Sequence, residues 1–283
     1  MDQACSSGRP ESPVRIDLHL HSTASDGSLS PGALVATARA GGLHIISLTD
    51  HDTAAGVQDA QTAARGTIHV IPGIEVSTSY AGSEVHILGY FIDPAHSRLI
   101  GYARDAAAYR RERMRRMLGR LDAIGVRIAY DEVLAAAGAE PESLGRPHLA
   151  RALVQRGYVH SHAEAFDRYI GNDAPAFLPA QLLEPGAAIG LIHDSGGVDV
   201  WAHPRADLFD RDLPRLKALG LDGVECFRPR VTPADALRME SVTREAGLLV
   251  TGGSDWHGEW HGRLGEYALS RDELGAFLDR GGI

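Results

Sequence analysis

Short apolar runs alternate with alanine-rich stretches along much of this chain, and the two kinds of stretch predict different elements. Runs of Val, Ile and Leu bounded by Gly, Pro or Asp are typical of buried strands, whereas Ala-rich stretches with interspersed charges are typical of helices. Strands are predicted at 14–20, 44–49, 68–78, 84–91, 198–202, 223–227 and 248–251. Helices are predicted between them at 30–40, 54–65, 213–219 and 233–246. Such alternation favours a mostly parallel sheet or barrel.

Two neighbouring strands form an exception to this alternation. Only a few residues, including Ala81 and Gly82, separate the strand predicted at 68–78 from the one at 84–91. This gap is too short for a crossover helix, so the two strands are predicted to form an antiparallel hairpin.

The strand pattern stops between Asp93 and about Pro185. Helices are predicted there at 99–124, 131–137, 147–156 and 162–170. We therefore expect a barrel domain formed by 14–95 and 186–283, a helical subdomain inserted at 96–185, and a disordered tail at 1–13. An arginine-rich run at 110–116 fits either a solvated helix face or a surface that attracts phosphate, and the sequence leaves both open.

Composition narrows the function classes. A length of 283 residues is typical of one α/β barrel with an insertion. The net charge of −9 argues against broad, non-specific binding to duplex DNA, which depends on neutralising phosphates. Neither a membrane-spanning run nor the apolar core of a signal peptide is present, and Cys5 and Cys226 have no metal or disulfide spacing. These features predict a cytoplasmic protein without a membrane partner.

The first and last strands each end in two metal-type side chains spaced two residues apart. His19 and His21 close the first strand, and Asp255 and His257 follow the last one. Side chains at positions i and i+2 of an extended chain point to the same face. Each pair is therefore able to face one site, which predicts a metal centre at strand ends.

Further candidate ligands also lie in or just after strands. His51 and His203 follow strands, while Glu75 and His86 lie within the predicted hairpin. Barrel enzymes place their active sites at the carboxyl ends of the strands, so these residues are expected to converge. A single buried histidine is more often a packed core residue than a metal ligand. The prediction of a metal centre therefore depends on the placement of all these residues together at strand ends. The other histidines singled out fit surface or packing roles: His44, His69, His96, His160, His162, His193 and His261.

The scarcity of lysine excludes one type of metal barrel. Amidohydrolase-type barrels also open with His-x-His, and they commonly bridge two ions through a carboxylated lysine on a strand. Lys217 is the only lysine here, and it lies in a helical pattern. Glu75 is therefore the candidate bridging ligand, because a carboxylate is able to span two cations.

The motifs resemble those of the polymerase and histidinol phosphatase (PHP) superfamily. The resemblance extends from Ile16 to about His257 and rests on the runs 17–22, 25–27, 49–52, 73–77, 85–89, 202–204 and 253–257. The inserted runs 145–154 and 165–170 are similar to the branch of nucleoside 3′,5′-bisphosphate phosphatases and a related 5′-to-3′ exoribonuclease.

The resemblance implies an α/β fold, a distorted seven-stranded (β/α)7 barrel with an inserted helical subdomain, and two or three divalent ions. By position, one ion would bind His19, His21, Glu75 and Asp255. A second would bind Asp26, His51 and His257, and a third Glu75, His86 and His203. Mixed imidazole and carboxylate ligands suit several ions. The resemblance favours Mn, with Fe, Zn or Mg as alternatives.

Catalysis would then rely on clustered positive charge. Divalent ions bind phosphate oxygens and lower the pKa of water, so the expected nucleophile is a metal-bridging hydroxide. Glu75 and Asp255 are the catalytic carboxylates by this reasoning, and Asp50 or Asp52 would orient water or ligands from behind them. The general acid is not indicated.

Substrate selection is expected in or near the insertion. Arg146 offers a planar fork of donors to phosphate, and His148 is a second donor beside it. An arginine that merely begins a helix, with Pro147 in the first turn, is the alternative for Arg146. Arg205 follows the run that contains His203 and is a third candidate.

The sequence thus predicts a metal-dependent phosphoesterase acting on a small nucleotide, such as 3′-phosphoadenosine 5′-phosphate, or on short 5′-phosphorylated RNA. Histidinol-phosphate phosphatase is an alternative of the same class. A non-catalytic, PHP-like regulatory module is an alternative of another class. Oligomeric state, base preference and the choice between nucleotide and oligonucleotide leave no mark in the sequence.

Overall fold

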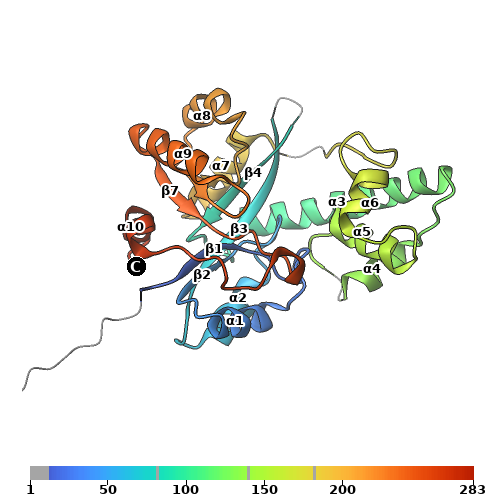
Figure 1. Cartoon of the computed structure of the whole chain (residues 1–283), viewed down its shortest axis with the longest axis horizontal. Coiled ribbons are helices and arrows are strands. Elements are labelled where there is room, and N and C mark those ends of the chain that lie inside the picture. The colour runs from blue at the N-terminus through green and yellow to red at the C-terminus, as the bar shows by residue number, and fades with distance from the viewer. Residues whose placement is uncertain (1–12, 81–82, 139–140, 181–182) are drawn as a thin grey trace, which may run out of the picture.

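A computed structural model describes residues 13–80, 83–138, 141–180 and 183–283 (Figure 1). It contains a curled sheet of helix-flanked strands and a separate group of helices to one side. The predicted α/β fold with a seven-stranded sheet is confirmed. The predicted turn residues Ala81 and Gly82, and nearly all of the predicted tail, lie outside the described residues.

The seven strands pair in chain order, from β1 to β7. The first three are parallel, β4 is antiparallel to both of its neighbours, and the last three are parallel. The predicted hairpin is therefore present, and it reverses one strand of an otherwise parallel sheet. The strands are β1 (Ile16–Leu20), β2 (Ile45–Leu48), β3 (His69–Tyr80), β4 (Ser83–Tyr90), β5 (Val198–Trp201), β6 (Gly223–Phe227) and β7 (Leu249–Gly252).

The curl of the sheet brings its two ends together. Backbone hydrogen bonds join β1 to the segment after β7, from His21 N to Trp256 O (3.0 Å) and from Trp256 N to His19 O (3.3 Å). Gly253 makes this approach possible, because a Cβ at that position would overlap the backbone of His19. The ends of the first and last strands, with their candidate ligands, thus lie side by side.

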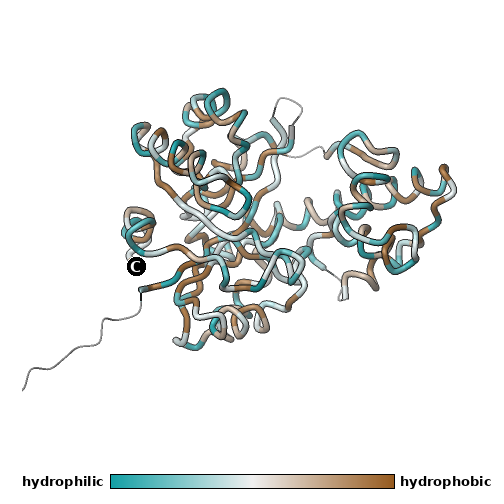
Figure 2. Tube along the Cα trace, viewed as in Figure 1, coloured by the Kyte–Doolittle hydropathy of each residue, from teal (hydrophilic) through white to brown (hydrophobic). Residues whose placement is uncertain are grey.

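Helices cover the outer face of the sheet (Figure 1). They are α1 (Pro31–Ala40), α2 (Val57–Ala64), α7 (Pro185–Asp194), α8 (Phe209–Ala218), α9 (Pro233–Glu245) and α10 (Arg271–Arg280). Ser30 and Thr232 cap α1 and α9 through their side-chain oxygens. The prediction missed α7 and α10. Apolar side chains such as Ile192 and Trp201 belong to the hydrophobic core of the sheet and its helices. The helices carry both hydrophobic and hydrophilic residues along their length (Figure 2).

A second group of helices lies between β4 and β5 in the sequence. It comprises α3 (Ser97–Ala123), α4 (Tyr130–Ala137), α5 (Arg146–Gln155), α6 (His162–Ala165) and the π-helical turn η1 (Phe166–Ile170). The helix predicted at 162–170 is thus divided in two. These elements bury their own apolar cluster, which includes Met117, Leu149 and Ile170. The group therefore has its own core beside that of the sheet.

The arginine-rich run lies on α3 and has a mixed environment. Arg115 is exposed, as expected for a solvated helix face. Arg110 and Arg113 instead point inward, where Arg110 pairs with Asp52 and Arg113 donates to the Leu178 carbonyl (2.9 Å). Of the two alternatives, a solvated face therefore does not describe Arg110 and Arg113, which attach α3 to its surroundings. None of the helices that the structure describes is long and apolar enough to cross a membrane.

Candidate metal centre

Glu75 is the hub of a histidine cluster at one end of the sheet. It is fully buried in β3, and its two carboxylate oxygens face five imidazole rings. Three nitrogens surround Oε2: His19 Nε2 (3.2 Å), His21 Nε2 (3.2 Å) and His51 Nδ1 (3.0 Å). Two surround Oε1: His86 Nδ1 (2.8 Å) and His203 Nε2 (2.9 Å). Segments from β1 to β5 thus converge on one carboxylate.

Asp255 adds a second carboxylate to the pair from the first strand. Its Oδ1 lies 3.3 Å from both His19 Nε2 and His21 Nε2. Its backbone has φ 53°, a left-handed conformation that is uncommon for a non-glycine residue. Such local strain is typical of functional positions. The four donors His19, His21, Glu75 and Asp255 lie close enough to share one ion.

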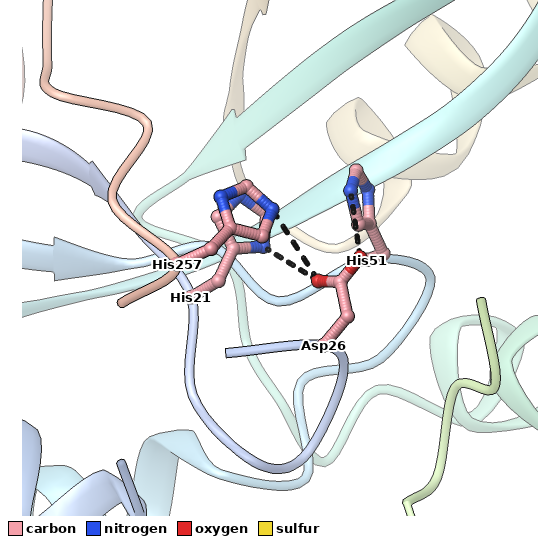
Figure 3. A group of neighbouring side chains, drawn as sticks. All are labelled: His21, Asp26, His51 and His257. Carbon is pink, nitrogen blue, oxygen red and sulfur yellow. Dashed lines mark ion pairs between the residues drawn. The ribbon is translucent and has the colours of Figure 1, made fainter. Parts of the chain in front are cut away.

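A third carboxylate, Asp26, lies beside three histidines (Figure 3). Its oxygens are 3.4 Å from His257 Nε2, 3.8 Å from His21 Nδ1 and 3.9 Å from His51 Nε2. The ring of His21 stacks on that of His257 with centroids 3.9 Å apart. His21 therefore faces two donor groups, although the family resemblance assigned it to one ion alone.

The third donor group is built around the other oxygen of Glu75. Donor atoms of His51, Glu75 and His86 lie close enough to share an ion. His203 faces the same Glu75 oxygen as His86, and the two rings are nearly perpendicular, at 76°. The structure thus gathers all nine predicted ligands into one continuous cluster.

The cluster fits divalent cations. His21 Nε2 and His51 Nδ1 are buried and have no hydrogen-bond partner, although both face Glu75 Oε2. Unsatisfied buried nitrogens are costly unless something else binds their lone pairs. Ligand atoms bonded to one ion at about 2.1 Å lie roughly 3.0–3.4 Å apart, which agrees with the separations around Glu75 and Asp255.

Burial and charge act against each other on the titrating groups. Burial opposes protonation of His21 and His86, but the adjacent carboxylates prevail and raise each pKa to about 10. The same attractions outweigh burial at Asp26, Glu75 and Asp255, and hold their pKa values well below the usual range. These carboxylates are therefore charged, and protons on His21 and His86 balance part of that charge until a cation takes their place. Burial instead lowers the pKa of His51 to about 3, which keeps that ring neutral.

Asp50 and Asp52 lie behind the cluster and contact the residues that shape it. Asp50 accepts hydrogen bonds from the hydroxyls of Ser22 (2.7 Å) and Ser25 (2.6 Å), which fixes the loop that carries Asp26. Asp52 accepts from Ser77 N (2.7 Å), Tyr102 and Arg110 Nε (2.7 Å). Both carboxylates are hydrogen-bonded to these partners, and neither belongs to the groups of donors that lie close enough to share an ion.

Sequence reasoning missed Glu225. This fully buried residue of β6 lies 2.9 Å from His19 Nδ1 through Oε1, and its Oε2 accepts from His203 N (2.7 Å). A carboxylate on the far nitrogen fixes the tautomer of a ligand histidine and leaves Nε2 free for metal. The available signal was a single acidic residue in the apolar run Gly223–Phe227.

The three predicted substrate residues have different surroundings. Arg146 lies with its guanidinium carbon 5.5 Å from the ring centres of both Phe166 and Phe177, and it pairs with Glu84 (3.3 Å). Glu84 in turn contacts His86 Nε2 (3.3 Å), so one carboxylate bridges Arg146 to the cluster. Arg205 is exposed and pairs with Asp207 (2.8 Å).

His148 is enclosed. It is 1% exposed, and its Nδ1 accepts from Gly145 N (2.9 Å) at the start of α5. Burial lowers its pKa to about 4, so the ring is neutral. His148 Nδ1 is thus occupied at the start of α5, and a contact of this residue with substrate stays a prediction.

A cavity of about 410 Å³ opens beside the His86 and His203 end of the cluster. Its wall combines residues from the β3–β4 hairpin, the helical insertion and the loop after β5. Apolar surface from Phe177 and Trp201 is present together with the cation of Arg205. This mixture is typical of a small-molecule site.

Comparisons with known proteins agree with this architecture. The PHP domain model matches residues 17–141. A 5′-3′ exoribonuclease of Haemophilus influenzae is 37% identical, with 86% of this chain and 90% of that protein covered. A 3′,5′-nucleoside bisphosphate phosphatase of Chromobacterium violaceum is 34% identical, with 88% and 89% covered. A structure from Bifidobacterium adolescentis, solved under the name of a metal-dependent phosphoesterase, superposes with a TM-score of 0.83 at 30% identity, with 94% and 96% covered.

Proposed function

Because this chain belongs to the PHP family and is a metal-dependent phosphoesterase, we propose that it removes a phosphate from nucleoside 3′,5′-bisphosphates. The observation that carries the proposal is the cluster of six histidines and three carboxylates, with Glu75 at its centre. The Chromobacterium violaceum relative, named for this activity, supports the choice of substrate class.

Nine residues would hold the ions: His19, His21, Asp26, His51, Glu75, His86, His203, Asp255 and His257. We assign Mn first, with Fe, Zn and Mg as alternatives, because imidazole and carboxylate donors accept all of these ions. When bound, the ions supply positive charge for the phosphate oxygens and activate water for in-line attack.

The surrounding residues would give the substrate its position. Arg146 is braced by two aromatic rings and would bind the phosphate that is not cleaved, in exchange for its pairing with Glu84. Asp50 and Asp52 would act through the loops that they hold, by keeping Asp26 and His51 in place. The cavity beside His203 would take the nucleoside, with Arg205 at its wall. In this scheme the insertion, 96–185, determines the substrate and the barrel performs the hydrolysis.

Short 5′-phosphorylated RNA is a second candidate substrate. The 37% identical Haemophilus influenzae protein is named for 5′-3′ exoribonuclease activity, and this identity exceeds that to the bisphosphate phosphatase. The two substrates share a 5′-phosphorylated nucleotide with a neighbouring 3′ phosphate group. One phosphate-binding arginine beside the cluster would serve both.

Parallel assays test the proposal. The Mn-loaded protein is expected to release phosphate from 3′-phosphoadenosine 5′-phosphate faster than from histidinol phosphate, while a labelled 5′-phosphorylated RNA pentamer measures the second candidate. An Asp255→Asn variant is expected to lose activity by about 100-fold or more with its fold retained by circular dichroism, because it removes a charged donor facing His19 and His21. Lack of turnover of both nucleotide substrates with Mn, Fe, Zn and Mg would refute the assignment.

A further inference from the structure

A second histidine–carboxylate cluster lies away from the metal centre. His193 is near the end of α7, Asp199 is in β5, and Asp222 immediately precedes β6. Asp199 lies near the start of β5, whereas His203 follows the end of that strand. The second cluster is at the amino-terminal ends of β5 and β6, whereas the metal centre is beyond their carboxyl ends.

One carboxylate oxygen in this second cluster has no hydrogen-bond donor. His193 Nε2 hydrogen-bonds to Asp222 Oδ2 at 3.0 Å. Asp199 Oδ1 lies even closer to the same nitrogen, at 2.7 Å, yet has no hydrogen-bond partner. Asp199 is 0% exposed, so water does not compensate this oxygen. One N–H therefore faces two carboxylate oxygens, and one buried acceptor is left unsatisfied.

The carboxylates also approach each other. Asp199 N contacts Asp222 Oδ2, and Asp222 N contacts Asp199 Oδ2, both at 3.4 Å. These reciprocal contacts hold the two side chains together despite their like charge. His193 is 41% exposed and Asp222 29%, so the cluster is open to solvent on one side.

We propose that His193, Asp199 and Asp222 bind one divalent ion, of which Zn²⁺ is the best match, separately from the ions of the phosphoesterase centre. A cation satisfies the orphaned Asp199 oxygen, removes the repulsion between the carboxylates, and needs only an unprotonated His193 Nε2. One nitrogen and two oxygens with open positions toward solvent suit Zn²⁺ completed by water. The ion ties α7 to the starts of two strands and serves stability.

Metal stoichiometry tests the site directly. Wild-type protein and the variants His193→Gln and Asp222→Asn are dialysed against increasing Zn²⁺, and bound metal is measured by elemental analysis. We expect each variant to bind one equivalent fewer than wild type, or to bind that equivalent at least about 10-fold more weakly. His69→Gln, which replaces an exposed histidine elsewhere, is the matched control and is expected to retain full binding.

Two further measurements keep the outcomes distinct. Phosphoesterase activity is expected to remain at the wild-type level in both variants, so a failure of the substrate assignment does not affect this test. Circular dichroism verifies the fold of each variant. Equal stoichiometry and equal affinity in wild type, both variants and the control would overturn the proposal and leave the cluster as an ion pair of a protonated histidine.

Discussion

Replacing Glu225 by glutamine tests how the cluster keeps its ligand nitrogens free. The carboxylate accepts from the His203 amide through one oxygen and faces His19 Nδ1 through the other, at 2.7 and 2.9 Å. Glutamine has a single acceptor oxygen, and its other terminal group is a donor. One of the two contacts therefore becomes donor against donor, unless the tautomer of His19 changes.

A change of tautomer has a specific cost. If His19 Nδ1 accepts from the glutamine amide, the proton moves to Nε2, the nitrogen that faces Glu75 and Asp255. That nitrogen then has no lone pair for an ion. Loss of such a supporting partner typically weakens metal binding by about 10–100-fold, equivalent to about 1.4–2.8 kcal/mol.

The assay is activity as a function of added Mn. For Glu225→Gln we expect the half-activating concentration to rise by this factor, while saturating Mn restores much of the maximal rate. Glu240→Gln is the control, because Glu240 pairs with Arg244 (2.9 Å) on a helix surface and such pairs contribute little. A Glu225→Gln titration that superimposes on that of wild type would refute the role assigned to Glu225.

Three further predictions follow from the contacts described above. Arg110→Met leaves the buried carboxylate of Asp52 without its cation, so the free energy of unfolding, measured with denaturant, is expected to fall by about 3–5 kcal/mol. Adding Asp52→Asn is expected to recover part of this loss. Equal stability of the single variant and wild type would contradict the prediction. Arg146→Ala is expected to raise KM for a nucleoside bisphosphate by about 10-fold or more, with little change for p-nitrophenyl phosphate; equal effects on both substrates would remove Arg146 from the phosphate site. Because His21 and His86 have a raised pKa of about 10 in the folded state, their protonation stabilises the metal-free protein fully below pH 6.5, and this stabilisation is lost as the pH rises toward 10. The unfolding free energy of the metal-free protein is therefore expected to fall over that range, and a pH-independent value would contradict this.

The fold was largely predictable because strand signals are local. Apolar runs such as those of β1 and β2 are short, bounded and fully buried, and the pattern located all seven strands. It missed α7, whose Gly186 and Gly190 weaken helix propensity, and α10, beyond the last strand that was assigned. The division of 162–170 at a π-helical turn has no propensity signal of its own.

The candidate site shows a similar limit. Donors that end strands have a spacing signal, so His19, His21 and Asp255 were found from the pattern, while Asp26 required the family resemblance. Glu225 has no spacing partner, and its importance arises only when β6 is placed beside β1 and β5. At His148 the sequence did not indicate that Nδ1 already accepts from Gly145 N at the start of a helix. Whether the polar atoms of a side chain are free to bind a ligand depends on its tertiary contacts.

The closure of β1 against the segment after β7 has a consequence for how the protein is made. His19 and Asp255 face one another, yet more than 230 residues of synthesis separate them. Until the last strand has emerged, the nascent chain holds an incomplete cluster of donors and an uncovered sheet edge, which is prone to wrong pairing. Correct metal loading is therefore a property of the finished chain, and a copy truncated before residue 249 would lack two of the nine donors however well its remaining strands assembled.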